Sequence, residues 1–251
     1  MNKIALVTGA TSGIGKATAL ILAKNGYDVI ITGRRDNLLG DVAIEIIDNI
    51  KSDCYPLCFD IRDIEQTKQA FIELPEKWKN IELLINNAGL AAGLAPIHEG
   101  DLNDWNQMID TNIKGLLNIT KIVSKIMIKK GKGQIINVSS IAGKEAYKNG
   151  TVYCGTKHAV EAITKGMRID LNPYNIKVGS ISPGAVETEF SIVRLKDENA
   201  NTKVYAGFTP LQANDIAESI LFMVNRPAHV NINDIFITPI AQATATIFNK
   251  K

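Results

Sequence analysis

Ser140, Tyr153 and Lys157 are the side chains best suited to exchange a proton with an alcohol or carbonyl oxygen. If residues 151–172 form a helix, Tyr153 and Lys157 stand four residues apart and leave one face of it. A free phenol has a pKa of about 10, and an ammonium held beside it favours the phenolate and lowers that pKa. Such a phenol can act as acid or base, while a Ser hydroxyl can hold the oxygen on which charge develops. A Tyr–Lys pair with this spacing also occurs on solvated helices, so the pair alone leaves both possibilities open.

A glycine-rich turn near the N-terminus supplies a second, independent signal. Residues 3–8 form a short apolar run typical of a buried parallel strand. A helical pattern follows the turn and ends at Gly26. Glycines let the backbone approach a pyrophosphate, and the start of a helix presents unpaired N–H groups to it. The turn therefore predicts a dinucleotide site, although a tight turn without a ligand has the same pattern. The residues expected to contact the dinucleotide here are Gly9, Ala10, Thr11, Ser12, Gly13, Ile14 and Gly15.

The end of the second expected strand, residues 27–32, indicates which dinucleotide is bound. NAD sites usually carry a carboxylate there, which holds the ribose 2′-hydroxyl. This chain has Gly33 at that place, followed by Arg34 and Arg35. Two guanidinium groups can hold a 2′-phosphate. The sequence therefore predicts NADP(H) rather than NAD(H), and the alternative for the two arginines is a solvated start to a helix over 36–50.

Segments made mostly of polar or small residues follow the other expected strands, 54–59, 81–86, 133–139 and 175–181. Because ligands bind beyond the carboxyl ends of parallel strands, these residues are expected at the same edge as the glycine turn. They are Asp60, Ile61, Asn87, Ala88, Gly89, Ser140, Pro183, Gly184, Val186 and Thr188. A helical region over about 103–130, in one or two parts, has Asn112 near its centre. An Asn inside a helix needs a reason, either solvation or a buried hydrogen bond.

Strands and helices alternate seven times, and no linker divides the chain. This pattern predicts a single domain over residues 1–251, of the α/β class, with a doubly wound parallel sheet between two helical layers. A last helix over 213–226 and a strand over 232–238 are expected to close the sheet. The polar, weakly patterned segment 188–213 is expected to form a flap over the pocket and has room for short helices.

Composition excludes several classes of function. The chain has 251 residues, 45% of them hydrophobic, and 28 basic against 26 acidic residues give a net charge of +2. This near balance of charge does not indicate binding to the phosphate backbone of a nucleic acid. No apolar run reaches the roughly 18 residues of a membrane span. The cysteines are odd in number and lack a CxxC pair, and the histidines lack metal-ligand spacing. These residues are Cys54, Cys58, Cys154, His98, His158 and His229. We therefore expect a soluble cytoplasmic protein without a metal, a nucleic-acid partner or a membrane partner.

In order and spacing, the motifs resemble those of the short-chain dehydrogenase/reductase family over nearly the whole chain. The matching motifs are Thr8-Gly9-x-x-x-Gly13-Ile14-Gly15, Asp60, Asn86-Asn87-Ala88-Gly89, Asn112, Ser140, Tyr153-x-x-x-Lys157 and Pro183-Gly184-x-Val186-x-Thr188. No single motif is specific, but together they are highly specific. The resemblance implies a Rossmann-type sheet of seven strands in the order 3-2-1-4-5-6-7.

The resemblance also implies roles for the matching residues. Tyr153 is expected to be the acid/base, and Lys157 to lower its pKa and hold the nicotinamide ribose. Ser140 is expected to position the carbonyl, and Asn112 to hold a water in the proton relay. Asn87 and the segment 183–188 are expected to cradle the nicotinamide side of the cofactor.

Within the family, the chain resembles the NADP-dependent 3-hydroxy acid (serine-type) dehydrogenase branch. The similarity covers segments 189–194, 210–211, 226–232 and 238–243. The resemblance implies interconversion of L-serine, L-allo-threonine or a small 3-hydroxy acid such as 3-hydroxypropionate with its carbonyl form, and a homotetramer. Where the branch commonly has Phe-Lys-Gly-Asp, this chain has Leu195-Lys196-Asp197-Glu198. That departure lies in the expected flap, so the substrate is less closely defined than the chemistry.

Arg194 in the flap can pair with a substrate carboxylate, although a solvated arginine has the same sequence context. We expect it to bind the substrate together with Ser140 and Tyr153.

Two other functions share these motifs. One is a 3-oxoacyl carrier-protein reductase or broad carbonyl reductase, and the other is a dinucleotide-binding scaffold without turnover. The intact Ser140, Tyr153 and Lys157 favour an enzyme over the scaffold.

Overall fold

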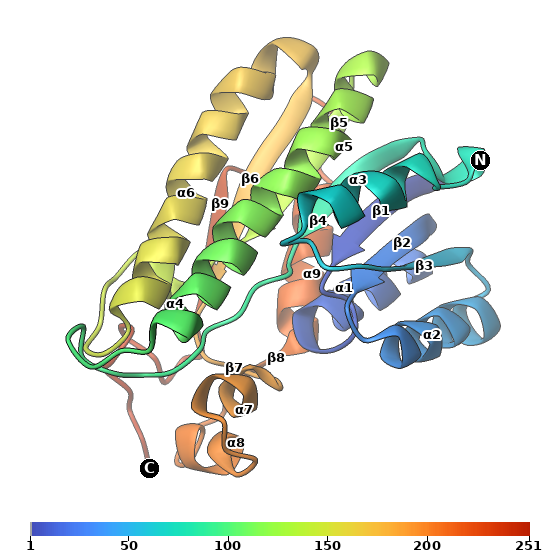
Figure 1. Cartoon of the computed structure of the whole chain (residues 1–251). Helices are drawn as coiled ribbons and strands as arrows, with labels where there is room; N and C mark the ends of the chain where they lie inside the picture. The colour runs from blue at the N-terminus through green and yellow to red at the C-terminus, as the bar shows by residue number, and fades with distance from the viewer. Residues whose placement is uncertain (1) are drawn as a thin grey trace.

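A computed structural model describes residues 2–251, which fold around a seven-stranded parallel sheet (Figure 1). The strands are β1 (Lys3–Thr8), β2 (Tyr27–Gly33), β3 (Cys54–Cys58), β4 (Ile81–Asn86), β5 (Gly133–Val138), β6 (Ile176–Pro183) and β9 (Asp234–Ile237). They lie in the order β3-β2-β1-β4-β5-β6-β9. The expected Rossmann-type doubly wound sheet is confirmed, with β9 in the seventh place.

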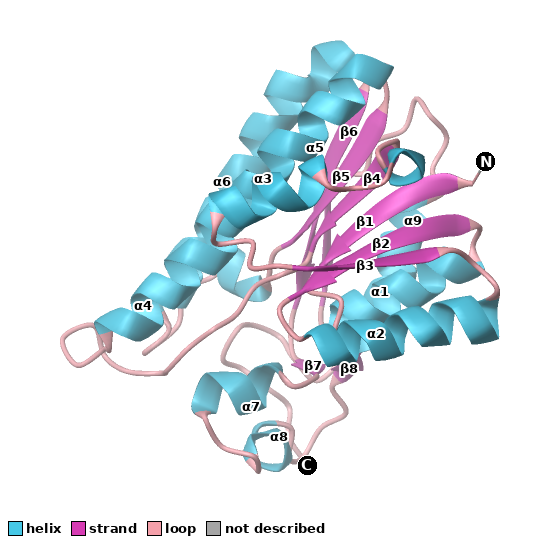
Figure 2. Ribbon diagram, turned by 45° about the vertical axis from the view of Figure 1, so that its right-hand side comes forward, coloured by secondary structure: helices cyan, strands magenta, loops and turns pink. Residues whose placement is uncertain are grey.

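Helices cover both faces of this sheet (Figures 1 and 2). One layer contains α1 (Gly13–Lys24), α2 (Asp36–Ile44) and α9 (Ala213–Val224), and the other contains α3 (Ile64–Ile72), α5 (Leu116–Lys130) and α6 (Thr151–Leu171). In β1, Ala5 and Val7 pack into the first layer, and Ile4 and Leu6 pack into the second. Because both faces are buried, the strands appear in the sequence as continuous apolar runs.

The helix expected over 103–130 is interrupted near its centre. After α4 (Leu102–Ile109) the chain makes one π-helical turn, Asp110–Gly115, and then continues as α5. Such turns are rare and frequently lie at functional sites, and this one contains Asn112. The helix expected over 36–50 likewise ends as α2 at Ile44 and continues as a π turn to Ile50.

A small lobe stands beyond the carboxyl edge of the sheet, within the segment expected to form a flap (Figure 2). It contains α7 (Phe190–Leu195) and α8 (Ala200–Val204). The parallel pair β7 (Val186–Glu187) and β8 (Leu211–Gln212) ties its two ends together. The sequence pattern does not predict this pair, because two-residue strands leave no periodic signal. The C-terminal tail packs on the lobe, where the ring centres of Phe208 and Phe248 are 4.9 Å apart.

Two classes of feature are missing from the described part of the chain. None of the helices within residues 2–251 combines the length and the apolar character that a membrane span requires. The same residues contain no group of three or more His, Cys, Asp or Glu side chains arranged to hold a metal ion. His158, for example, uses its Nδ1 on the carbonyl of Cys154 in its own helix, at 2.9 Å.

Candidate active site

The glycine turn after β1 and the turn after β4 are joined by hydrogen bonds at the sheet edge. The Thr8 hydroxyl accepts from the backbone N–H groups of Asn87 and Ala88, both at 3.0 Å. The Asn87 amide donates to the carbonyls of Thr8 and Gly9 at 2.8 and 3.1 Å. A Cβ on Gly15 would lie 2.2 Å from the Gly9 carbonyl oxygen, so only glycine allows this approach. The structure thus brings these predicted cofactor residues together.

The N-terminus of α1 faces this edge with its donors free. Its first turn contains no acidic residue, and the Ser12 side chain does not cap it. A helix start of this kind attracts an anion. Thr188, from the segment after β6, lies opposite, because a Cβ on Gly13 would come within 3.3 Å of the Thr188 side chain. The N-terminus of α1 and the 183–188 segment therefore face one another across a narrow space.

A carboxylate of the chain itself lies against donors at this helix start. Glu189 accepts from the Ser12 hydroxyl at 2.8 Å and from the Arg35 guanidinium at 3.1 Å. Arg35 also donates to the hydroxyls of Thr11 and Ser12, at 2.8 and 2.9 Å. Hydroxyl and guanidinium donors that converge on one negative group are the donor set that a phosphate requires. Glu189 stands in for such an anion, so the residues present fit a dinucleotide phosphate.

The residue before the two arginines also fits a dinucleotide that carries a 2′-phosphate. A Cβ on Gly33 would lie 2.7 Å from the Thr11 side chain, so no carboxylate fits at that position without movement. Arg34 is about half exposed and lies 3.9 Å from Asp60. Asp60 is bound mainly by Arg62, whose Nε donates to it at 2.9 Å. The neighbouring Ile61 is buried.

Tyr153 and Lys157 lie in the first turns of α6, and both side chains are buried. The Lys157 amine donates to the Val138 carbonyl at 3.0 Å and lies 6.0 Å from the centre of the Tyr153 ring. Ser140, directly after β5, accepts from the backbone N–H of Ala142 at 3.1 Å. The three side chains that opened the sequence analysis therefore meet at the carboxyl edge of the sheet.

The expectation that Tyr153 has a lowered pKa is wrong for this structure. Burial raises the pKa of the Tyr153 phenol above its usual value, and the nearby Tyr147 adds to that effect. The Ser140 hydroxyl and the Arg194 charge oppose the rise in pKa without cancelling it. Burial likewise lowers the pKa of Lys157 to about 8, against the opposing charge of Glu161. The sequence spacing brings Tyr153 and Lys157 together, but exclusion of water dominates both pKa values.

Asn112 is explained by buried hydrogen bonds and not by solvation. Its amide oxygen accepts from the Leu90 N–H at 2.8 Å. Its amide nitrogen donates to the Leu90 carbonyl at 2.8 Å and to the Thr156 hydroxyl at 3.0 Å. A Cβ on Gly89 would lie 3.1 Å from the Asn112 oxygen and 3.4 Å from the Lys157 amine. The π turn and α6 therefore meet at the Gly89 backbone.

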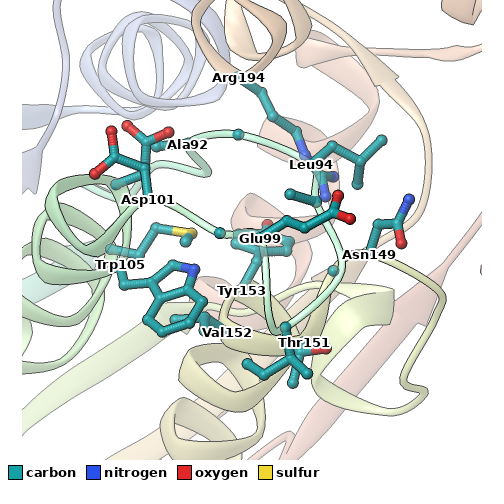
Figure 3. A pocket seen from close by; sticks show the side chains of 17 residues that line it. Ala92, Leu94, Glu99, Asp101, Trp105, Asn149, Thr151, Val152, Tyr153 and Arg194 are labelled. Atoms are coloured by element: carbon teal, nitrogen blue, oxygen red, sulfur yellow. The ribbon is translucent and has the colours of Figure 1, made fainter.

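A cavity of about 180 Å³ opens beside Tyr153 (Figure 3). Tyr153, Val152 and Thr151 line one side of it, and Arg194 reaches it from α7. The cavity is smaller than the pockets of about 300–1,000 Å³ that hold drug-sized ligands. It therefore suits a molecule of a few heavy atoms.

Arg194 is held in this cavity by a residue that sequence reasoning missed. Its Nη1 donates to the Tyr147 hydroxyl at 2.9 Å, and its guanidinium carbon lies 5.4 and 5.3 Å from the ring centres of Tyr147 and Tyr153. Its Nε and Nη2 are buried and have no hydrogen-bond partner among the described residues. Buried charged donors without partners are costly. The guanidinium is thus arranged to receive an anionic group.

Comparison with known proteins agrees with this geometry. Residues 3–199 match the family model described as short chain dehydrogenase. The chain is 47% identical over 243 residues to a probable NADP-dependent dehydrogenase of Haemophilus influenzae, which covers 96% of this chain and 95% of that one. It is 42% identical over 246 residues to a serine 3-dehydrogenase of Rhizobium radiobacter, with 98% and 97% covered. A solved structure, the closed form of serine dehydrogenase complexed with NADP+, superposes with a TM-score of 0.92 at 38% identity over 99% of both chains.

Proposed function

The chain belongs to the short chain dehydrogenase family, and from that premise we propose that it interconverts a small 3-hydroxy acid and its carbonyl form with NADP(H). The substrates in view are L-serine, L-allo-threonine and 3-hydroxypropionate. The observation that carries the proposal is the Arg194 guanidinium at the cavity that Tyr153 lines, whose buried Nε and Nη2 have no hydrogen-bond partner within residues 2–251. An enzyme for uncharged carbonyl compounds has no need of that cation.

The sheet edge would hold the cofactor through backbone and side-chain donors. The residues assigned to it are Gly9, Ala10, Thr11, Ser12, Gly13, Ile14, Gly15, Arg34, Arg35, Asp60, Ile61, Asn87, Ala88, Gly89, Tyr153, Lys157, Pro183, Gly184, Val186 and Thr188. The exposed side chains of Arg34 and Arg35 would bind the 2′-phosphate. When bound, NADP(H) supplies or accepts the hydride.

The protein's own contribution is to orient the substrate and move one proton. Ser140 would hold the substrate oxygen by a hydrogen bond, and Tyr153 would give a proton to it in reduction or take one in oxidation. The raised pKa of Tyr153 keeps the phenol protonated at neutral pH, the form that serves reduction. Oxidation needs the phenolate, which the charges of Arg194 and Lys157 favour. Asn112 would fix the Leu90 backbone beside this group through its two hydrogen bonds to that backbone and take part in the proton relay.

A substrate panel tests the proposal directly. Following NADPH absorbance, we expect L-serine or 3-hydroxypropionate to have a kcat/KM at least about tenfold above that of a 3-hydroxyacyl thioester, because one charge-assisted hydrogen bond is worth about 1.5–3 kcal/mol. Turnover of the thioester without turnover of any hydroxy acid would instead identify a carrier-protein reductase. If the protein turns over no member of the panel, the alternative of a dinucleotide-binding scaffold without turnover is supported.

The cofactor preference has its own prediction. NADPH should raise the thermal unfolding temperature more than NADH at equal concentration, because a ligand that binds only the native state stabilises it in proportion to the logarithm of concentration over Kd. Arg34→Ala is the variant of choice, since the one ionic contact of Arg34 within residues 2–251 is the 3.9 Å contact to Asp60. It should shrink the NADPH shift and leave the NADH shift nearly unchanged. A larger shift with NADH for the wild-type protein would overturn the preference.

The proposal includes a homotetramer in the cytoplasm, as the family resemblance implies. Support for assembly comes from large apolar side chains that the single chain leaves in water. Phe222 and Phe236 are each 50% exposed, and Ile240 is fully exposed. Apolar groups gathered at a surface usually mark a contact with another chain.

A further inference from the structure

A cluster of charged and hydroxyl side chains lies against α6, one helical turn beyond Lys157. Lys144, from the segment after Ser140, donates to the Glu161 and Asp234 carboxylates, both at 2.8 Å. The Ser182 hydroxyl donates to the other oxygen of Glu161 at 3.0 Å. Glu161 belongs to α6, Ser182 to β6 and Asp234 to β9, elements that lie side by side in Figure 1. The Glu161 carboxylate is therefore fixed from two sides.

The cluster carries an unbalanced charge. Two carboxylates, Glu161 and Asp234, share the single ammonium of Lys144, so the three groups together are negative by one charge. The Glu161 side chain is only 9% exposed. A buried charge without a counter-charge is costly. Four residues before Glu161 on the same helix stands Lys157, which is also buried and whose amine is bound by the neutral Val138 carbonyl.

The packing around these two side chains leaves little room for water. A Cβ on Gly143 would lie 2.9 Å from the Lys157 carbonyl oxygen and 3.2 Å from Cγ of Glu161. The short helical turn that contains Gly143 is thus pressed against the Lys157–Glu161 stretch of α6. Charges in such surroundings interact more strongly than charges in water.

We propose that Glu161 is a positioning residue: its carboxylate, fixed by Lys144 and Ser182, keeps Lys157 in its charged form beside Tyr153. The use of that charge in turnover rests on the proposed function, but the coupling of Glu161 to Lys157 does not. Consistent with the geometry, burial lowers the pKa of Lys157 to about 8 while the Glu161 charge resists the fall. Without Glu161, the pKa of Lys157 would be lower, and the amine would lose its proton at a lower pH.

The other charged groups on elements that pack against α6 have partners of their own. Asp104 on α4 is bound by Lys196 at 3.1 Å, and Asp110 in the π turn is bound by Lys114 at 2.7 Å. On α6 itself, Arg168 donates to the Val178 carbonyl at 2.8 Å. On the cavity side, Lys157 faces the phenol of Tyr153, with Tyr147 and the Arg194 charge behind it. Among these groups, Glu161 is the one whose charge raises the pKa of Lys157.

An NMR titration of the cofactor-free protein with ¹³Cε-labelled lysine tests the proposal without substrate. The Lys157 signal is assigned by its loss in Lys157→Arg. Wild-type Lys157 is expected to titrate with a midpoint of about 8. In Glu161→Gln the midpoint should fall by about 1 pH unit or more. Asp170→Asn, which removes an exposed carboxylate from the same helix, is the matched control and should leave the midpoint unchanged.

A second variant predicts a shift of the opposite sign. Lys144→Met removes the ammonium that neutralises Glu161 and Asp234, so their field should raise the Lys157 midpoint above that of the wild type. A purely structural role for the cluster would not give opposite shifts. If Glu161→Gln fails to fold by circular dichroism, Lys144→Met decides alone: a rise supports the proposal, and no change or a fall overturns it.

The pH profile of turnover supplies the functional readout. In Glu161→Gln, the rise of alcohol oxidation with pH should move to higher pH, because a neutral Lys157 no longer favours the Tyr153 phenolate. A lower kcat with an unmoved profile, together with an unmoved NMR midpoint, overturns the proposal. Opposite NMR shifts in a protein that turns over no hydroxy acid would uphold the coupling and refute the proposed substrate class instead.

Discussion

Tyr153→Phe should lower kcat by about 10³-fold, the middle of the range of about 10²–10⁴-fold that a positioned proton donor contributes. The change removes one hydroxyl from a ring that is buried at the cavity wall. Binding of NADPH should be nearly unchanged, because the glycine turn, Arg34 and Arg35 keep their contacts. Single-turnover kinetics and a fluorescence titration with NADPH measure the two quantities separately.

Tyr174→Phe is the matched control for that experiment. It removes the same hydroxyl from a ring that is 43% exposed, in the short helical turn after α6, and it should leave both kcat and NADPH binding unchanged. If Tyr153→Phe keeps more than about a tenth of wild-type turnover, Tyr153 is not the proton donor. Loss of NADPH binding together with turnover would point instead to a role in holding the cofactor.

Arg194→Met should raise KM for a hydroxy acid by about 10²-fold, because charge-assisted hydrogen bonds of about 1.5–3 kcal/mol each are lost. For an uncharged alcohol of the same size the change in KM should stay small, since Met fills a similar volume and no ionic contact is lost. Nε and Nη2 of Arg194 are the groups concerned, because Nη1 already donates to Tyr147. Steady-state kinetics on the paired substrates measure the split.

Lys203→Met provides the control within the same lobe. Lys203 lies on α8, is 70% exposed and pairs with Asp197, so its loss removes an equal charge away from the cavity. KM should remain near the wild-type value for both substrates. Equal losses on acid and alcohol in Arg194→Met would mean that Arg194 supports the cavity wall and does not bind the carboxylate.

The sequence was sufficient for the fold because its signals are local. A strand buried on both faces appears as an apolar run, as residues 3–8 show. No other residue can replace Gly15, because a Cβ there would lie 2.2 Å from the Gly9 carbonyl oxygen. Helix spacing likewise puts Tyr153 and Lys157 on one buried face. The interruption at Asp110–Gly115 was not predicted beyond a possible division of the helix, because a π turn has no sequence period of its own.

The electrostatics of the site could not be predicted from spacing. The pKa of Tyr153 depends on burial and on Tyr147 and Arg194, which reach it from separate segments. Glu189 was also missed, because its contact with Ser12 and Arg35 joins residues more than 150 positions apart. Glu161 did leave a signal: a carboxylate four residues after Lys157 must share its buried face of the helix.

Arg194 sits close to both tyrosine rings, and its charge eases loss of the Tyr153 proton. A carboxylate bound in the cavity neutralises this guanidinium and so weakens its effect on the pKa of Tyr153. Binding of an anionic ligand and the pKa of the phenol are therefore thermodynamically linked. One side chain in the lobe thereby governs both which molecules are accepted and how readily hydrogen ions are released. Evolution cannot retune the first of these properties at that position without also altering the second.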